Sequence, residues 1–251
     1  MERYFEINEI GHNIRCKLYC SSPAAIEKVI LYCHGFAGHK DTRAAAKFAD
    51  RVLTKYKKIA VLAFDWPCHG DDVKKKLQLK DCDAYVRLIT EYIKKQYATE
   101  DIYAYATSFG GYLILKYISE NGNPFRKIAL RCPAVDMYGT LTKSIITPEA
   151  REKMDKGKNA LVGFDRKIEV SPQFLAELQE ADITGRDFLP YADDIIIIHG
   201  SKDELLSGEG LRRFADDNVI EFILIQNADH RFQDPNTMEA ATKAVLGFFE
   251  L

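Results

Sequence analysis

The chain has 251 residues, a formal net charge of -2, and 47% hydrophobic and 29% charged residues. This near-neutral composition gives no electrostatic reason to expect a nucleic acid or an anionic membrane as a partner. No stretch reaches the roughly 18 consecutive apolar residues that a membrane span needs. No linker-like tract divides the sequence, so we expect a single globular domain over residues 1–251.

The cysteines and the N-terminal segment suggest a cellular location. The first residues lack a basic region followed by an apolar run, so we expect no signal peptide. No CxxC pair occurs among the six cysteines, which are Cys16, Cys20, Cys33, Cys68, Cys82 and Cys132. We therefore expect reduced, mostly buried thiols, with no disulfide framework, metal site or other cofactor. These features predict a cytoplasmic protein, and nothing in the sequence specifies an oligomeric state.

Apolar runs typical of strands alternate with amphipathic segments along most of the chain. The predicted elements are hairpin strands within 3–20, strands at 28–33, 59–64, 102–106, 127–131, 195–199 and 219–225, and helices at 42–56, 81–97, 112–119 and 237–249. Four consecutive isoleucines, Ile195–Ile198, are typical of a strand buried on both faces. Strands that alternate with helices predict an α/β fold with a mostly parallel sheet covered on both faces.

One segment interrupts this alternation. Between Pro133 and Pro190 the sequence contains helix-like pieces and scattered apolar residues but no clear sheet strand. A structureless loop of almost sixty residues would be unusual inside a compact domain. We therefore expect a helical cap at about residues 134–190, lying over the strand ends where ligands bind in open α/β sheets.

The segment around Ser108 has the pattern of a nucleophile elbow. Ser108 lies between the predicted strand 102–106 and the predicted helix 112–119, with Ala106 and Gly110 two positions away on either side. Such a turn forces a strained backbone at the serine and requires small neighbours where strand and helix nearly touch. A serine in a turn can also be structural only, so the assignment depends on finding its partners.

Two later loops supply those partners. A serine hydroxyl becomes a good nucleophile when a base accepts its proton and a third group orients that base. Asp203 follows the isoleucine strand, and His230 lies between the last strand and the last helix. This is the order Ser, Asp, His in which elbow-type enzymes carry their triad. We therefore predict Ser108 as nucleophile, His230 as general base and acid, and Asp203 as the group that orients His230.

A glycine-rich loop after the strand at 28–33 fits half of an oxyanion hole. The tetrahedral intermediate of acyl transfer needs two N–H donors, one of them from the residue after the nucleophile. We predict the backbone N–H groups of Phe36 and Phe109 as these donors, with Gly35 allowing close approach of the backbone. The alternative is a turn that serves sheet geometry alone.

These motifs together resemble the α/β-hydrolase superfamily, in the serine-hydrolase branch that holds bacterial carboxylesterases, cinnamoyl and feruloyl esterases, monoacylglycerol-lipase-like enzymes and some aminopeptidases. The resemblance extends from about Lys28 to Leu251 and is weakest in the cap. It implies an eight-stranded sheet with a lid after the sixth strand. The sequence departs from the family pattern at Ala106, Cys68 and Asp72, where glycine, glycine and serine are common.

We hypothesise a hydrolase for small-molecule carboxylic esters of small or medium acyl or aromatic acids. Alternatives with the same triad are an aminopeptidase or amidase and a thioesterase or acyltransferase; a remote one is a non-catalytic binding protein on a hydrolase scaffold. An aminopeptidase would need an acidic subsite, for which Asp136, Glu149 and Asp165 are candidates. For the substrate pocket we name Gly35, Met137 and Tyr138, although the last two could equally form the core of the lid.

Overall fold

A mostly parallel sheet of eight strands forms the centre of the computed structural model, which describes residues 1–251. The strand order is β1-β2-β4-β3-β5-β6-β9-β10, and only the pairs β1/β2 and β2/β4 are antiparallel. The strands are β1 (Glu2–Glu9), β2 (His12–Tyr19), β3 (Lys28–Cys33), β4 (Ile59–Phe64), β5 (Ile102–Thr107), β6 (Lys127–Arg131), β9 (Ile195–Gly200) and β10 (Glu221–Ile225). This confirms the predicted α/β class and all strands predicted for the sheet.

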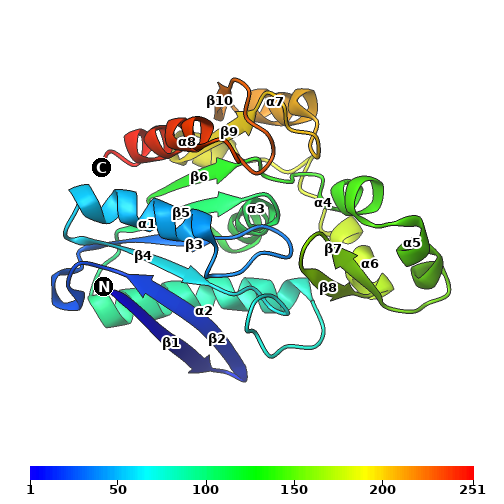
Figure 1. Cartoon of the computed structure of the whole chain (residues 1–251), viewed down its shortest axis with the longest axis horizontal. Coiled ribbons are helices and arrows are strands. Elements are labelled where there is room, and N and C mark those ends of the chain that lie inside the picture. The colour runs from blue at the N-terminus through cyan, green and yellow to red at the C-terminus, as the bar shows by residue number, and fades with distance from the viewer.

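Helices cover both faces of the sheet, as Figure 1 shows. One face packs against α1 (Arg43–Lys55) and α8 (Pro235–Phe248), and the other against α2 (Leu79–Tyr97), α3 (Phe109–Asn121) and α7 (Gly208–Asp217). Every residue of β4, β5 and β9 is buried, because these strands lie between the two helical layers. The four isoleucines of β9 therefore pack on both sides, as their continuous apolar run predicted.

The parallel strands end at the edge that faces a smaller lobe (Figure 1). This lobe, the cap, contains α4 (Met137–Thr140), the π-helical turn η2 (Leu141–Ile145), α5 (Pro148–Asp155), β7 (Ala160–Gly163), β8 (Lys167–Val170) and α6 (Pro172–Glu180). It follows β6, the sixth strand along the chain. Short 3₁₀ segments, η1 (Pro23–Ala25) and η3 (Leu189–Asp194), precede β3 and β9.

The expectation of a wholly helical cap is wrong, because β7 and β8 form an antiparallel hairpin. Their register places Ala160 opposite Val170 and Val162 opposite Ile168, and these four side chains are buried. Each strand thus contributes only two inward-facing apolar residues in four positions. So short an alternation is a weak signal in sequence, and the hairpin is recognisable only once it packs against the rest of the cap.

One helix, α7, was absent from the predicted elements. Its buried residues Leu211, Phe214 and Ala215 have helical spacing, and Ser207 caps its first turn by accepting a hydrogen bond from the N–H of Gly210. Glycines at 208 and 210 lower the helix propensity of the segment. Tertiary packing of the apolar face therefore decides the conformation here. None of the helices has the length and hydrophobicity that crossing a membrane requires.

Candidate active site

Ser108 occupies the sharp turn between β5 and α3. Its backbone has φ 49° and ψ -115°, a left-handed conformation that is strained for a side chain larger than glycine. The turn is held by hydrogen bonds, since the Ser108 N–H donates to Arg131 O at 3.0 Å and the Tyr112 N–H donates to Ser108 O at 3.1 Å. A Cβ added to Gly110 would lie 2.6 Å from the carbonyl oxygen of His34. The close approach that the sequence predicted at this glycine is therefore present.

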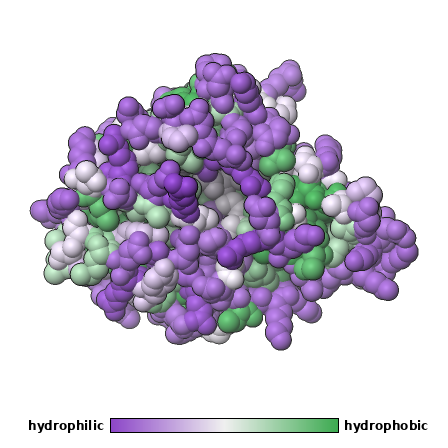
Figure 2. Space-filling view, viewed as in Figure 1, coloured by the Kyte–Doolittle hydropathy of each residue, from purple (hydrophilic) through white to green (hydrophobic).

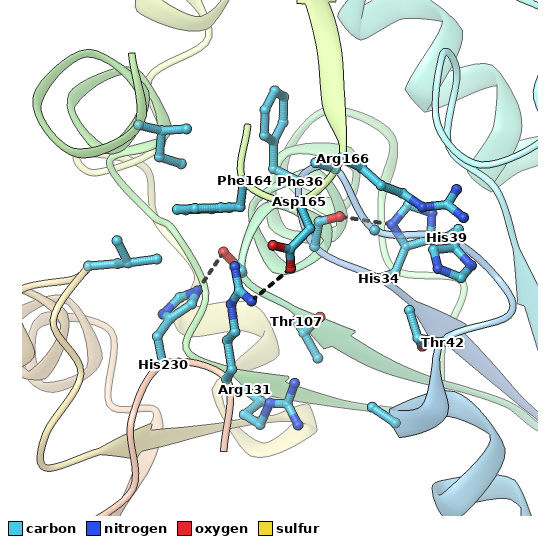
Figure 3. A pocket seen from close by; sticks show the side chains of 18 of the residues that line it. His34, Phe36, His39, Thr42, Thr107, Arg131, Phe164, Asp165, Arg166 and His230 are labelled. Carbon is cyan, nitrogen blue, oxygen red and sulfur yellow. Dashed lines mark hydrogen bonds and ion pairs between the residues drawn. The ribbon is translucent and has the colours of Figure 1, made fainter. Parts of the chain in front are cut away.

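The three predicted triad residues, Ser108, His230 and Asp203, form one hydrogen-bonded row, the relay. His230 Nε2 lies 3.1 Å from Ser108 Oγ, and His230 Nδ1 lies 2.8 Å from Asp203 Oδ2. Ser108 comes from the β5–α3 turn, Asp203 from the loop after β9, and His230 from the loop after β10. The parallel strands bring these loops together although the residues are far apart in the chain. In Figure 3, His230 points into the cavity.

Asp203 is fixed and ionised. Its side chain has no exposed surface, and its Oδ1 accepts hydrogen bonds from the N–H groups of Leu205 and Leu206 at 2.9 and 3.0 Å. Burial alone would raise the pKa of Asp203, but the hydrogen bond and charge of His230 outweigh it and lower the pKa to about 2. An ionised carboxylate only accepts hydrogen bonds, so His230 must donate from Nδ1. Nε2 then presents its lone pair to Ser108, as a general base requires.

Two backbone N–H groups beside Ser108 are free to bind an anion. The Phe36 N–H has no acceptor within the protein, and Phe109 is the first residue of α3, before the first intrahelical hydrogen bond. The rings of Phe36 and Phe109 meet edge to face with centroids 5.6 Å apart, which holds the two segments together. Gly35 lies so close to the elbow that an added Cβ would be 3.3 Å from Ser108 Cβ.

A pair of buried histidines supports the loop that carries Phe36. His34 Nε2 accepts from the Trp66 N–H at 3.3 Å, and the Trp66 indole N–H donates to the His34 carbonyl at 3.0 Å. The rings of His34 and His69 lie 5.4 Å apart. Burial lowers the pKa of both, that of His69 to about 4. These imidazoles are neutral supports of the site, a role that the sequence reading did not assign.

A cavity of about 370 Å³ opens beside Ser108. Besides the relay residues Ser108 and His230, its lining includes Tyr32, His34, Gly35, Phe36, Ala37, Gly38, His39, Thr42, Ala44, Thr107, Arg131, Thr140, Ile145, Phe164, Asp165, Arg166, Leu205 and Arg231. Figure 2 shows a recess near the middle of this mostly hydrophilic face, with hydrophobic surface gathered beside it toward the cap. The cavity therefore lies between the sheet edge and the cap.

Two of the predicted pocket residues lie elsewhere. Met137 is only 2% exposed and belongs to the main hydrophobic core, and Tyr138 packs against that core. Both line a separate small cavity of about 70 Å³ together with Tyr112 and Leu178. Met137 and Tyr138, at the start of α4, lie against Tyr112 of α3 and Leu178 of α6, whereas Thr140, at the end of α4, lines the main cavity. Gly35 does line the cavity beside Ser108.

The cavity walls carry more positive than negative charge. Three arginines line it, Arg131, Arg166 and Arg231, against one carboxylate, Asp165. Arg231 lies 3.5 Å from Asp165, so the carboxylate is already paired. Sequence reasoning missed these arginines, since arginine at a strand end or in a turn is most often a solvated surface residue.

One set of side chains could in principle hold a metal ion. Ligand atoms of Cys132, Asp203 and His230 lie within 4.8 Å of one another. Asp203 and His230 are already joined by the hydrogen bond of the relay, so a bound ion would compete with it. All six cysteines are free, and five of them are buried, as predicted for most of these thiols.

Comparisons with known proteins identify a hydrolase family and hydrolase structures with a similar fold. The sequence model of a protein family described as "Serine aminopeptidase, S33" matches residues 24–162. A search of curated proteins finds no match. Est1E from Butyrivibrio proteoclasticus, solved with ferulic acid bound, is similar with a TM-score of 0.75 and 17% identity, over 98% of this chain and 100% of that one.

Two further solved structures have the same fold. A soluble variant of monoglyceride lipase from Saccharomyces cerevisiae, in complex with a substrate analogue, gives a TM-score of 0.76 at 13% identity, covering 100% of this chain and 94% of that one. The mouse alpha/beta hydrolase domain-containing protein 10 gives a TM-score of 0.75 at 14% identity, covering 99% of this chain and 98% of that one. At such identities the likeness concerns the fold.

Proposed function

The chain belongs to the serine aminopeptidase S33 family of the α/β-hydrolase superfamily, and from this we propose that it hydrolyses small carboxylic esters through an acyl-enzyme on Ser108. The observation that carries the proposal is the row Asp203–His230–Ser108, with contacts of 2.8 and 3.1 Å. Two solved structures similar to this chain contain ferulic acid or a lipase substrate analogue. These ligands support an ester of an aromatic or aliphatic acid as the substrate.

The proposed reaction begins at Ser108. Its Oγ attacks the ester carbonyl carbon while its proton passes to His230 Nε2, and Asp203 stabilises the imidazolium that forms. The carbonyl oxygen becomes negative and accepts hydrogen bonds from the N–H groups of Phe36 and Phe109. Each such donor contributes about 2.7–4 kcal/mol of transition-state stabilisation in comparable enzymes.

His230 completes both half-reactions. It returns its proton to the leaving alcohol, which departs and leaves the acyl group on Ser108. A water molecule then gives a proton to His230 and attacks the acyl carbon. His230 passes this proton to Ser108 Oγ as the bond between Oγ and the acyl carbon breaks, which releases the carboxylic acid and restores the serine. The Nδ1–H of His230 remains directed at Asp203 throughout, so the ring keeps one orientation in both steps.

The family description raises an aminopeptidase as the second candidate. Such an enzyme would bind the α-ammonium group of a peptide through a free carboxylate near Ser108. Of the three acidic candidates, Asp136 and Glu149 do not line the cavity, and Asp165 is paired with Arg231. The positive lining therefore favours an ester over a peptide with a free amine. A thioesterase or acyltransferase would use the same acyl-enzyme.

The test is hydrolysis of 4-nitrophenyl esters from acetate to dodecanoate, beside aminoacyl 4-nitroanilides, by the wild type and by Ser108→Ala. Loss of the nucleophile costs on the order of a million-fold in kcat in subtilisin. We expect turnover of esters that disappears in Ser108→Ala and persists in Ser144→Ala, which alters an exposed serine of the cap. Turnover of anilides alone would establish the peptidase instead, and turnover of neither class would contradict the proposed ester hydrolysis.

The predicted cytoplasmic location is part of this proposal. Six free cysteines suit a reducing compartment, where thiols are kept from forming disulfides. Fractionation of cells that produce the protein would test it, and recovery with a secreted or membrane fraction would contradict it.

A further inference from the structure

Four cationic side chains of lysine and arginine are buried in this protein, and one of them lacks a counter-charge. Lys17, Lys40, Lys116 and Arg131 are 6%, 4%, 5% and 7% exposed. Each lysine contacts at least two carboxylates: Lys17 has Glu2 and Asp41, Lys40 has Asp41, Asp65 and Asp71, and Lys116 has Asp83 and Glu120. Arg131 forms no ion pair, although an unpaired buried charge is costly.

The hydrogen-bonding capacity of Arg131 is almost unused. Its Nε has no partner, and its Nη1 contacts only the thioether sulfur of Met238, a weak acceptor, at 3.1 Å. The guanidinium carbon lies 5.2 Å from the centre of the Phe232 ring, a favourable cation–π distance. Beside it lies the buried hydroxyl of Tyr105, which contacts the guanidinium but makes no well-formed hydrogen bond. A buried guanidinium whose partners are a thioether and a hydroxyl, with no carboxylate, still has donors for an anionic acceptor from outside the chain.

Arg131 lies between the active-site cavity and a second cavity of about 210 Å³. The two cavities share Tyr32, Ala44 and Arg131 as lining residues, and Tyr105 lines the second. Arg131 stands opposite Thr107 in the β5–β6 pairing, and neighbouring strands are about 4.8 Å apart. Ser108 directly follows Thr107, and Ser108 and Arg131 line the same cavity, so a short chain attached to Ser108 can extend toward the guanidinium.

The surroundings of Arg131 add positive charge. Thr42 and Ala44, at the N-terminus of α1, line the active-site cavity, and a helix N-terminus attracts anions. The second cavity is lined by Lys47 and Arg51 as well, against one carboxylate, Glu239, which lies 2.8 Å from Arg51. Since the whole chain has a net charge of -2, this positive excess is local to the two cavities.

We propose that Arg131 binds a carboxylate of the substrate, so that the preferred esters carry a negative charge a few carbon atoms from the bond that is cleaved. This proposal rests on the proposed ester hydrolysis at Ser108 and adds its substrate class. A carboxylate accepts two parallel hydrogen bonds from a guanidinium, and the Tyr105 hydroxyl can donate a third. The same cation disfavours substrates with an ammonium group.

The experiment compares charged esters with matched neutral ones. On the acyl side, the mono-4-nitrophenyl esters of glutaric and adipic acids are compared with 4-nitrophenyl pentanoate and hexanoate, after subtraction of spontaneous hydrolysis. On the alcohol side, 4-carboxyphenyl butyrate is compared with 4-carbamoylphenyl butyrate. We expect kcat/KM to favour the charged member at least about tenfold in one of the two series, which then identifies the side of the ester that faces Arg131.

Variants of Arg131 test whether it causes this preference. In Arg131→Met the ratio of charged to neutral kcat/KM should fall about 10- to 150-fold, which corresponds to the roughly 1.5–3 kcal/mol of a charge-assisted hydrogen bond. Arg131→Lys should retain part of the ratio, because it keeps the charge without the guanidinium fork. Arg212→Met is the matched control, since Arg212 also lies over a phenylalanine ring, at 5.3 Å, but away from both cavities. It should leave the ratio unchanged.

A binding measurement separates this inference from the proposed function. Adipate, but not adipamide, should raise the Tm of Ser108→Ala in a concentration-dependent way, and the double variant with Arg131→Met should lose the effect. If Ser108-dependent hydrolysis occurs with no charge preference and no adipate binding, the inference fails and the esterase stands. If adipate binds but no ester is hydrolysed, the anion site stands and the proposed function fails.

Discussion

Polar side chains are fully hydrogen-bonded on one side of the candidate site, the relay, and poorly hydrogen-bonded on the other, the cavity wall around Arg131. On the relay side, Asp203, His230 and Ser108 are joined at 2.8 and 3.1 Å, and the second oxygen of Asp203 is held by two backbone N–H groups. On the cavity wall, the buried guanidinium of Arg131 has no carboxylate partner, and its only polar contacts are the Met238 thioether and the Tyr105 hydroxyl. Groups that are fully paired in the free protein hold a fixed geometry. A group without such partners can bind one from outside the chain, so in the two proposals above the relay side carries out the reaction and the wall selects the substrate.

After removal of the nucleophile itself, the largest expected effect comes from breaking the relay at Asp203. In Asp203→Asn the side-chain oxygen should stay on the N–H groups of Leu205 and Leu206, which turns the amide NH₂ toward His230 Nδ1. His230 would then carry its proton on Nε2 and could not accept one from Ser108. We expect kcat for the best ester to fall about 10⁴-fold, as in the corresponding serine protease variant.

The matched control is Asp229→Asn, which alters the neighbouring acid of the same loop. Asp229 accepts a hydrogen bond from the Gln233 N–H and takes no part in the relay. Its variant should keep kcat within a few-fold of wild type. Similar losses in both variants would mean that loop structure, and not the tautomer of His230, controls the rate.

A second prediction contrasts two buried cations. Lys40→Met leaves the fully buried carboxylate of Asp65 without its counter-charge, so the free energy of unfolding should fall by about 3–5 kcal/mol. Arg131→Met leaves no carboxylate without its counter-charge, so its loss of unfolding free energy should be smaller than that of Lys40→Met by at least about 2 kcal/mol. Urea unfolding measures both, with Lys58→Met in an exposed ion pair as a control that should cost below about 1 kcal/mol. Equal losses for Lys40 and Arg131 would show that Arg131 has a buried anionic partner within the chain.

A third prediction concerns pH and the buried histidines behind the relay. Burial lowers the pKa of His69 from 6.5 to about 4, so between these values the unfolded chain binds more protons than the folded one. The free energy of unfolding should therefore fall as pH drops from about 6.5 to 4, by about 3 kcal/mol from His69 alone. Below this range Asp203, whose pKa is lowered to about 2, loses its own contribution as it protonates.

His69→Gln should remove much of the slope between pH 6.5 and 4, measured by urea unfolding at several pH values. A slope that persists unchanged in this variant would assign the pH dependence to other groups. His34, whose pKa burial also lowers, is the first of these to be tested.

The smallest expected effect lies at the mouth of the cavity. Arg231 contacts Asp165 of the cap at 3.5 Å, and the two side chains are 45% and 92% exposed. Exposed ion pairs contribute little, so Arg231→Gln should change the free energy of unfolding by less than about 1 kcal/mol. A loss above about 2 kcal/mol would mean that this contact holds the cap to the rest of the domain. The charged groups at the mouth would then be firmly paired, like those of the relay and unlike Arg131 on the wall.

Much of the architecture could be predicted from the sequence because its signals are local. The predicted helices and sheet strands are present, with ends displaced by no more than three residues, as at α3, which begins at Phe109 instead of Tyr112. The contact of Ser108, Asp203 and His230 also follows from chain order, since loops after parallel strands meet at one edge of the sheet. The chemical roles of these residues remain predictions for the experiments above to test.

Other features depend on packing between distant segments, and the sequence did not reveal them. Two apolar residues per strand gave no clear sign of the β7–β8 hairpin. Likewise, only the packing of α4 against α3 and α6 decides that Met137 belongs to the core while Thr140 lines the cavity. Arg131 is an ordinary strand-end arginine in sequence. Its significance arises because the fold places carboxylates against Lys17, Lys40 and Lys116 and none against Arg131. The sequence by itself thus determined the elements and their order, whereas the tertiary structure decided which buried charges have partners, because pairing depends on side chains that meet only after folding.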